Sequence, residues 1–143
     1  MSVRISATDW VEGGVDGAES VEIARAFTRA GADIIHVSTG ETSIDAQPVY
    51  GRMYQTPYSD RIRNEAGVRT IAVGNIMTAD QVNAIITAGR ADLCAIGRPH
   101  LYEPNWTLHA AAELGYAAQR WPASYFPGRR QLERELEKQR STV

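Results

Sequence analysis

The chain has 143 residues, of which 43% are hydrophobic and 22% are charged, and its formal net charge is −2. This composition is typical of one globular domain, and the chain is long enough to bury a core. The near-neutral charge argues against a general nucleic-acid binder or a protein that binds anionic membranes. The sequence holds no run of about 18 apolar residues that could cross a bilayer. Because the one cysteine, Cys94, cannot form an internal disulfide, we expect a reducing compartment, the cytoplasm.

Four apolar runs typical of buried strands alternate with helical patterns along the chain. The predicted strands are residues 3–8, 33–38, 69–73 and 91–96. Four helices are predicted. The first ends near residue 30, the second spans residues 59–65, the third begins after Thr78 and ends at Gly89, and the fourth runs from Pro104 to about residue 114. A helix that stops at glycine and is followed by an aspartate and a buried strand occurs twice. This repeat predicts an α/β fold with parallel strands.

Four βα units supply half of a (β/α)₈ barrel, which needs about 250 residues. The chain is therefore a smaller open sheet, a fragment, or a half-barrel that closes against another chain. We predict a half TIM barrel over residues 1–115 and an extension over 116–143, with a loop at 121–128 and a charged helix at 129–140. Uncovered strand edges favour self-association or pairing with a missing N-terminal half.

Glycine follows two consecutive predicted strands, in the pairs Gly74-Asn75 and Gly97-Arg98. Glycine at the carboxyl end of a parallel strand lets backbone N–H groups approach a phosphate closely, and this is where barrels often bind phosphate. Arg98 adds a planar set of charged donors. The sequence therefore predicts a phosphate or nucleotide-cofactor site. The alternative is that the glycines only form turns and that Arg98 makes a surface ion pair with Glu103.

The first predicted strand carries a charged residue on one of its two faces. Alternation places Val3, Ile5 and Ala7 on one face and Arg4 on the other. If the polar face points inward, Arg4 needs an anionic or acceptor-rich partner. Alternatively, Arg4 is simply solvated near the N-terminus.

The connection over residues 39–57 is longer than the usual link in α/β proteins and carries Tyr54, so it is expected to shape a substrate pocket or to be mere decoration. The three histidines, His36, His100 and His109, have no partners at metal-ligand spacing, and we predict no metal site. His100 has the strongest functional claim of the three, since it follows Arg98.

Taken in chain order, these segments resemble the C-terminal half of the old yellow enzyme family of flavin-dependent ene-reductases. The finer resemblance is to the reductase portion of bifunctional aromatic acyl-CoA monooxygenase/reductases. The resemblance runs from about residue 3 to 106. The matching stretches are Arg-Ile-Ser-Ala-Thr-Asp-Trp at 4–10, Asp33 to Gly40, Tyr-Gln-Thr-Pro-Tyr at 54–58, Ala-Val-Gly-Asn-Ile at 72–76, and residues 90–99.

The resemblance implies FMN bound at the mouth of a (β/α)₈ barrel, with NADH or NADPH as the electron donor. It places Arg4 near N1 and O2 of the flavin ring. It assigns the phosphate to Gly74 and Asn75 and to Gly97 and Arg98. It places Tyr54 at one flank of the substrate region.

The family's first four strands have no counterpart here, and with them the proton-donor tyrosine and the residues that anchor the substrate carbonyl. The resemblance therefore implies the FMN-binding portion of an NAD(P)H-dependent flavin oxidoreductase, incomplete for catalysis alone. Two alternatives stay open. One is a different phosphate-binding barrel enzyme, and the other is a non-catalytic binding or assembly module.

Overall fold

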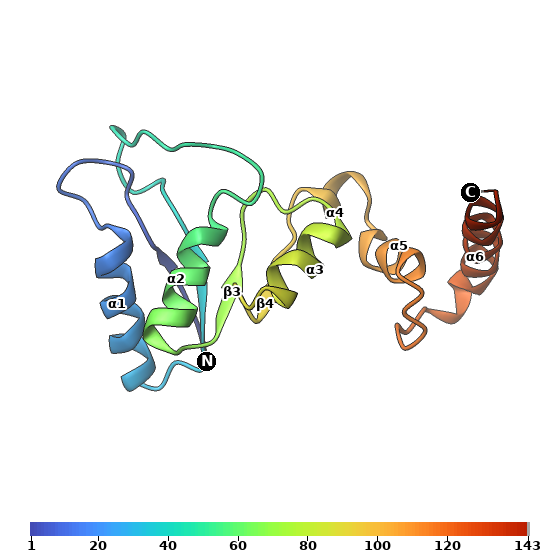
Figure 1. Cartoon of the computed structure of the whole chain (residues 1–143), viewed down its shortest axis with the longest axis horizontal. Helices are drawn as coiled ribbons and strands as arrows, with labels where there is room; N and C mark the ends of the chain where they lie inside the picture. Colours follow the sequence, from blue (N-terminus) through green and yellow to red (C-terminus); the bar gives the residue numbers. More distant parts are fainter. Residues whose placement is uncertain (143) are drawn as a thin grey trace. The chain divides into compact units, whose positions relative to one another are not determined.

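The computed structural model describes residues 1–142, in a first unit, Met1–Ile96, and a second unit that begins at Gly97. The first unit holds a sheet of four parallel strands in the order β1-β2-β3-β4 (Figure 1). Its elements, in chain order, are β1 (Ser2–Ser6), α1 (Gly17–Arg29), β2 (Ile34–Ser38), α2 (Thr56–Ala66), β3 (Thr70–Ala72), α3 (Ala79–Thr87) and β4 (Leu93–Cys94). The predicted α/β fold with four parallel strands is confirmed.

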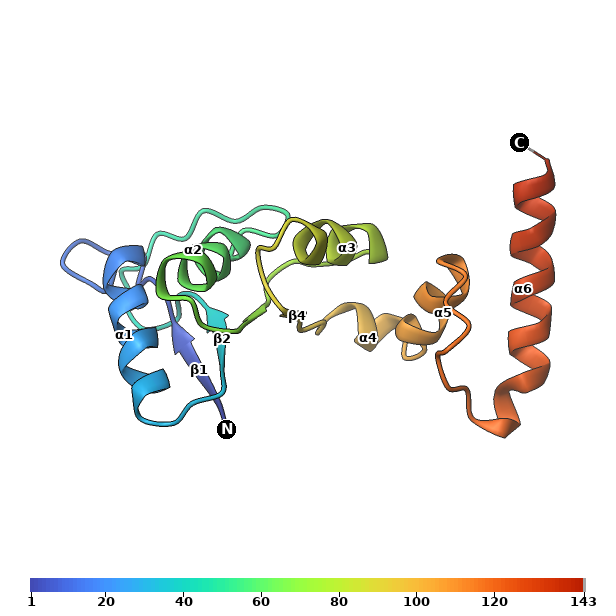
Figure 2. The same ribbon diagram turned by 60° about the horizontal axis from the view of Figure 1, so that its bottom comes forward.

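One face of the sheet forms the core of the first unit. Ile5, Val37 and Ala72 occupy one register row across β1, β2 and β3. Val37 and Ala72 are fully buried, as is Ile62 of α2. Helices α1, α2 and α3 contribute the side chains that pack on this face, so all three cover the same side of the sheet (Figures 1 and 2). Each fully buried aliphatic side chain contributes about 1.5–3 kcal/mol through removal of apolar surface from water.

The opposite face of the sheet has no helix of the first unit packed on it. Its central register row is Arg4, His36, Ile71 and Leu93. Leu93 is 54% exposed and Arg4 is also exposed, whereas His36 and Ile71 are half-buried. Parallel sheets are ordinarily covered on both faces. The open face, as we call the surface formed by this row, is therefore the unpartnered side of the first unit.

Helices α1 and α3 begin at capping side chains. The Asp16 side chain accepts hydrogen bonds from two backbone N–H groups at the start of α1, and the Glu19 carboxylate accepts one from the Asp16 N–H. Thr78 caps α3 as predicted, by accepting from the N–H of Gln81. The Gln81 side chain in turn accepts from the N–H of Met77, the residue before Thr78.

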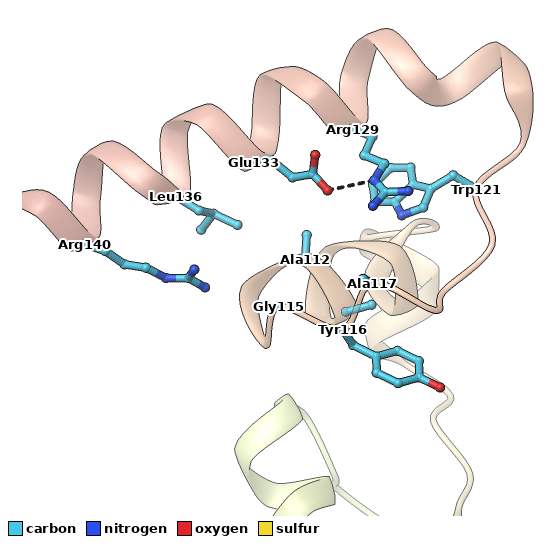
Figure 3. Close-up of a pocket in the computed structure, with 10 residues that line it drawn as sticks. Ala112, Gly115, Tyr116, Ala117, Trp121, Arg129, Glu133, Leu136 and Arg140 are labelled. Atoms are coloured by element: carbon cyan, nitrogen blue, oxygen red, sulfur yellow. Dashed lines mark hydrogen bonds and ion pairs between the residues drawn. The ribbon is translucent and has the colours of Figure 1, made fainter.

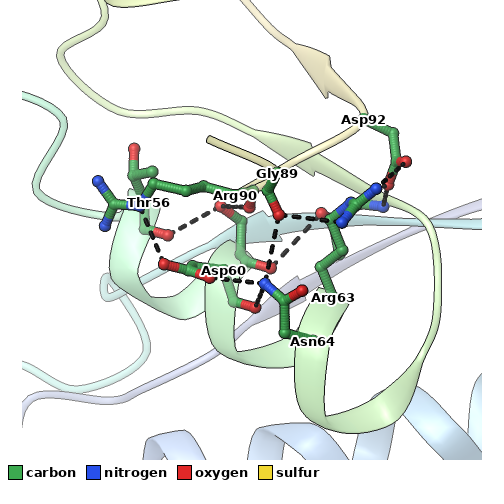
Figure 4. Close-up of polar contacts among 9 residues, drawn as sticks. Thr56, Asp60, Arg63, Asn64, Gly89, Arg90 and Asp92 are labelled. Carbon is green, nitrogen blue, oxygen red and sulfur yellow. Dashed lines mark hydrogen bonds and ion pairs between the residues drawn. The ribbon is translucent and has the colours of Figure 1, made fainter. Parts of the chain in front are cut away.

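A set of polar contacts joins α2 to the segment that leads into β4 (Figure 4). Arg63 donates to both carboxylate oxygens of Asp92 at 3.1 and 3.2 Å and to the Gly89 carbonyl at 3.0 Å. Asp92 also accepts from the backbone N–H of Thr70 at 2.9 Å. These bonds give the backbone N–H at the start of β3 an acceptor, and they hold β3 and β4 in register. Burial alone would raise the pKa of Asp92, but the bonds from Thr70 and Arg63 lower it overall.

The predicted strand over residues 91–96 is much shorter in the structure, where β4 is Leu93–Cys94. The backbone bonds continue one residue on each side, from Asp92 N–H to Thr70 and from Ala95 N–H to Ala72. The one neighbour of β4 is the three-residue β3, and their ladder pairs only Ile71 with Leu93 and Ala72 with Cys94, so β4 ends with its short partner. On α1 the buried side chains are Ser20, Val21 and Ala24, whereas Phe27 is 39% exposed.

The second unit is helical. It comprises α4 (Pro99–Tyr102), α5 (Trp106–Glu113), a short 3₁₀ turn η1 (Ala123–Tyr125) and α6 (Phe126–Ser141). The predicted helix from Pro104 begins two residues later, and the predicted loop at 121–128 is wrong in part, since it contains η1 and the first turn of α6. Pro127 causes this difference: proline is accommodated in a first helical turn, where no intrahelical N–H bond is needed. Among residues 1–142, no helix is long and apolar enough to cross a membrane.

Candidate functional site

The site is built at the carboxyl end of β1 and β2, on the open face. The guanidinium of Arg4 donates to the hydroxyl of Ser38 at 2.9 Å, and its other terminal nitrogen lies 3.4 Å from Nε2 of His36. Arg4 is therefore neither buried without a partner nor simply solvated. It lies on the open face, where it donates to both Ser38 and His36, and its remaining N–H groups meet no acceptor within residues 1–142.

Gln55, directly before α2, links this group to the next strand. Its side chain is buried, at 5% exposure, and its carbonyl oxygen accepts from Ser38 at 3.2 Å and from Thr39 at 2.9 Å. The same side chain fills the space beside Gly74, where an added Cβ would lie 2.1 Å from Nε2 of Gln55. Gly74 also has φ +106, so both its conformation and its neighbour require glycine.

The turn after β3 is tied to the end of the long connection. Asn75, with φ 51, donates from its side chain to the Gly51 carbonyl at 2.9 Å and accepts at its own carbonyl from Met53 N–H at 3.2 Å. Within the described residues, the backbone N–H groups of Gly74 and Asn75 donate to no protein acceptor. Two consecutive backbone N–H groups without an acceptor, at the end of a strand, are the kind of group that binds an anion.

The long connection is held at several points, so it is a structured wall of this edge. Asp9, after β1, accepts from Thr42 at 2.6 Å and from Val15 N–H at 2.8 Å, and these bonds lower the pKa of Asp9. Farther along, the ring of Tyr54 packs edge-on against Tyr50 at a centroid distance of 5.3 Å. Tyr54, a predicted site residue, is half-buried next to Gln55.

His36 is the titratable group of the site. Burial lowers its pKa below the ordinary value of 6.5, and the adjacent positive charge of Arg4 lowers it further. On its other side along the register row lies Ile71, which is apolar. The lowered pKa favours the neutral ring, whose Nε2 accepts the hydrogen bond from Arg4.

Gly97 and Arg98, the other predicted pair, begin the second unit. Gly97 has an unremarkable φ and an added Cβ there would meet nothing within 4 Å, so no steric reason for glycine exists at this position. The alternative ion pair of Arg98 with Glu103 is absent from the described residues, since Glu103 binds His109 at 2.6 Å. His100 contacts Thr107 at 3.3 Å, within its own unit.

A shallow hollow of about 140 Å³ lies between α5 and α6 in the second unit (Figure 3). Its charged groups already have partners: Arg129 binds Glu133 at 2.7 Å, and Arg140 donates to the carbonyl of Glu113. Ligand pockets are usually about 300–1,000 Å³. This hollow is therefore a seam between two packed helices, lined in part by Trp121.

The structure thus brings Arg4, Gly74, Asn75 and the segment of Tyr54 to one edge of the first unit. Sequence reasoning missed Ser38 and Gln55 as site residues, and it ranked His36 below His100. For His36 a signal was available, because the strand register pairs it with Arg4. Among residues 1–142, no group of three or more His, Cys, Asp or Glu side chains could hold a metal.

The chain matches known flavoproteins over most of its length. Residues 1–116 match the sequence model of the NADH:flavin oxidoreductase / NADH oxidase family. An NADPH dehydrogenase of Listeria monocytogenes serotype 4a is 39% identical over 113 residues, which is 79% of this chain and 33% of that protein. NADPH dehydrogenases of Halalkalibacterium halodurans and Geobacillus thermodenitrificans are also 39% identical.

The chain spans about a third of the length of the curated relatives it matches. The family's fold is an eight-stranded TIM barrel, of which the four parallel strands and their covering helices form a part. The predicted resemblance is confirmed at the level of the family. With its sheet, its strand-end glycine and this match over residues 1–116, the chain belongs to the NADH:flavin oxidoreductase / NADH oxidase family, the family of the old yellow enzymes.

Proposed function

We propose that this chain supplies the FMN-binding edge of an NAD(P)H-dependent flavin oxidoreductase of the ene-reductase type. One observation carries the proposal: Gly74, in a conformation and packing that require glycine, presents its N–H group and that of Asn75 without a protein acceptor. The family binds FMN, and the phosphate of FMN is an anion that such donors suit.

The residues present fit the cofactor at both of its ends. Arg4, exposed on the open face, would meet the N1 and O2 side of the flavin ring, where its fixed charge stabilises the negative charge of the reduced ring. FMN supplies the hydride-accepting ring when bound. His36, held neutral beside Arg4, adds hydrogen-bonding capacity without further charge.

For Gly97 and Arg98, a phosphate contact stays a prediction from the family resemblance. The guanidinium of Arg98 is exposed and makes no ion pair within the described part of the chain, so it is free to meet an anion. Tyr54 stays a predicted residue of the substrate flank. These residues would set the affinity for cofactor and substrate, whereas Arg4 would act on the reacting ring.

We further propose that catalysis requires polypeptide beyond this sequence. The relatives are about three times as long as the matched region, and they are named NADPH dehydrogenases, which favours NADPH as the electron donor. The open face, with Leu93 54% exposed, lacks the cover that a parallel sheet ordinarily has. A second copy of the chain or a separate half-barrel would provide that cover. The cytoplasm is the compartment we assign.

The alternative of a non-catalytic assembly module is favoured by one observation. The second unit exposes several large apolar side chains and contains few buried ones, which is typical of a surface that packs against another protein. These exposed side chains are Leu101, Tyr102, Leu114, Tyr116, Tyr125 and Phe126. On this alternative the chain would associate through its helical unit and bind no flavin.

A paired titration separates these functions. FMN and riboflavin share the ring system but only FMN carries the phosphate, so fluorescence titration of the full chain with each should show tighter binding of FMN. Arg98→Ala should reduce the preference, since the Gly74 and Asn75 N–H groups remain, and should leave riboflavin binding unchanged. Equal affinity of the wild-type chain for both flavins would contradict a phosphate site, and no binding of either would favour the assembly module.

A further inference from the structure

The Gln55 side chain touches the end of β2 and the turn after β3 at the proposed cofactor edge. Its carbonyl oxygen accepts from the hydroxyls of Ser38 and Thr39, and its amide nitrogen lies against Gly74. It is buried, and it sits at the N-cap position of α2, whose backbone fixes where the side chain begins.

The hydrogen bonds around Ser38 have a defined direction. A serine hydroxyl has one proton to donate and two lone pairs that can accept. The Ser38 hydroxyl donates toward Gln55 at 3.2 Å and accepts from Arg4 at 2.9 Å. Without the acceptor on Gln55, the hydroxyl proton is free to rotate toward the guanidinium, where two donors would oppose each other. Gln55 therefore holds Arg4 in place through Ser38.

The other end of the same amide controls the turn after β3. The space that a side chain at Gly74 would occupy is taken by Gln55, whose Nε2, Cδ and Cγ atoms would lie 2.1–2.8 Å from an added Cβ. This packing keeps Gly74 in its left-handed conformation. The N–H groups of Gly74 and Asn75, in this turn, donate to no protein acceptor within residues 1–142.

We propose that Gln55 is a positioning residue that sets Arg4 and the Gly74–Asn75 turn in one fixed relation, so that the two ends of one FMN molecule are met together. This inference rests on the proposed function of the edge. Gln55 touches Gly74 directly and reaches Arg4 only through Ser38.

The test replaces the amide while retaining its volume, in Gln55→Met. His36 reports on the position of Arg4, because Arg4 is the charged group beside it and contributes to lowering its pKa. If Gln55 holds Arg4 in place, the pKa of His36, measured by NMR titration of the full chain, rises in Gln55→Met. An unchanged His36 titration in a folded variant overturns the proposal.

A second variant keeps the test decisive if Gln55→Met does not fold. Ser38→Ala removes the intermediate hydroxyl and should raise the pKa of His36 by the same amount. The double variant should show no further rise, since both changes break one chain of contacts. Additive effects, or no effect of Ser38→Ala, would contradict it. Gln47→Met is the matched control, because its side chain is exposed on the same connection.

Cofactor affinity provides the second readout. FMN should bind Gln55→Met about tenfold more weakly than the wild-type chain, the effect expected from losing one well-placed hydrogen-bonded contact. Equal FMN affinity in the two proteins overturns the positioning role. If the wild-type chain binds no FMN, the proposed function fails, and the His36 titration still decides whether Gln55 positions Arg4.

Discussion

The two faces of the sheet differ in what they contain and in how completely they are built. On the covered face, Ile35 and Val37 are fully buried under helices of the same unit. On the open face, the neighbouring positions of the same strand are His36 and Ser38, which bond to Arg4 and Gln55. A single strand thus serves stability with one set of alternating residues and the proposed cofactor site with the other.

The two faces therefore differ in whether the first unit's own helices bury them. The covered face obtains its burial from elements within the first unit. Among the described residues, the open face has N–H groups that lack a protein acceptor, and it has an exposed leucine. Such a surface is typical of one that another molecule covers. Four expected outcomes sharpen or break this comparison.

The largest effect is expected from one aliphatic truncation on each face. Ile62→Ala removes a fully buried side chain from the core and should lower the free energy of unfolding by about 2–5 kcal/mol. Leu93→Ala, at a position 54% exposed, should lower it by less than about 1 kcal/mol. Urea unfolding of both variants measures this. A large loss at Leu93 would show that the open face is covered in solution.

The two strand-end glycines provide a matched pair. Gly74→Ala must place a Cβ against Gln55 at a positive φ and should destabilise the chain by about 2 kcal/mol. Gly97→Ala meets open space and should change stability by less than about 0.5 kcal/mol. Thermal unfolding of the two variants gives the comparison. Similar losses at both positions would remove the structural distinction between the glycines.

Asp92 should make stability depend on acid pH. Its folded pKa lies below the ordinary value of 3.8, so its contribution is present above that value and is lost as pH falls through the lower folded pKa. Asp92→Asn should cost about 1 kcal/mol at pH 7, and this difference should shrink toward pH 3. Unfolding midpoints of both proteins across this range measure it, and a constant difference would contradict the assignment to Asp92.

The smallest effect concerns His36. Its folded pKa lies below 6.5, so as pH falls through that value the unfolded chain takes up the proton first and stability decreases until the folded pKa is reached. His36→Gln should remove this part of the pH dependence. Denaturant unfolding at pH 7.5 and 5.5 tests it. The same loss on acidification in both proteins would assign the effect to other groups.

Much of the fold follows from the sequence because its signals are local. Alternating apolar residues predict each strand, and Asp16 and Thr78 are capping residues at the starts of α1 and α3. The short β4 was not predictable in this way, since its length depends on its pairing with the three-residue β3. The start of α6 within a predicted loop was signalled by Pro127, which is compatible with a first helical turn.

The site was predicted in part, for a physical reason. Arg4 and Gly74 carry individual signals, namely a charge on a strand and a glycine at a strand end. Gln55 carries none, because its role arises from contacts with Ser38, Thr39 and Gly74 that join distant segments. The roles of Gly97, Arg98 and Tyr54 stay predictions.

The size of the particle in solution also bears on the comparison. If another copy covers the open face, light scattering after size-exclusion chromatography should give a mass of at least twice the 15.7 kDa of one chain. A stable monomer would leave cover by a separate half-barrel as the remaining form of the proposal.

The most direct test of the cofactor edge is the visible absorption spectrum of the purified full chain, incubated with FMN and then desalted. We expect the wild-type chain to retain a flavin band, which should be lost in Gly74→Ala and kept in Gly97→Ala. A wild-type chain that emerges colourless, while remaining folded by circular dichroism, would contradict the claim that this edge holds FMN.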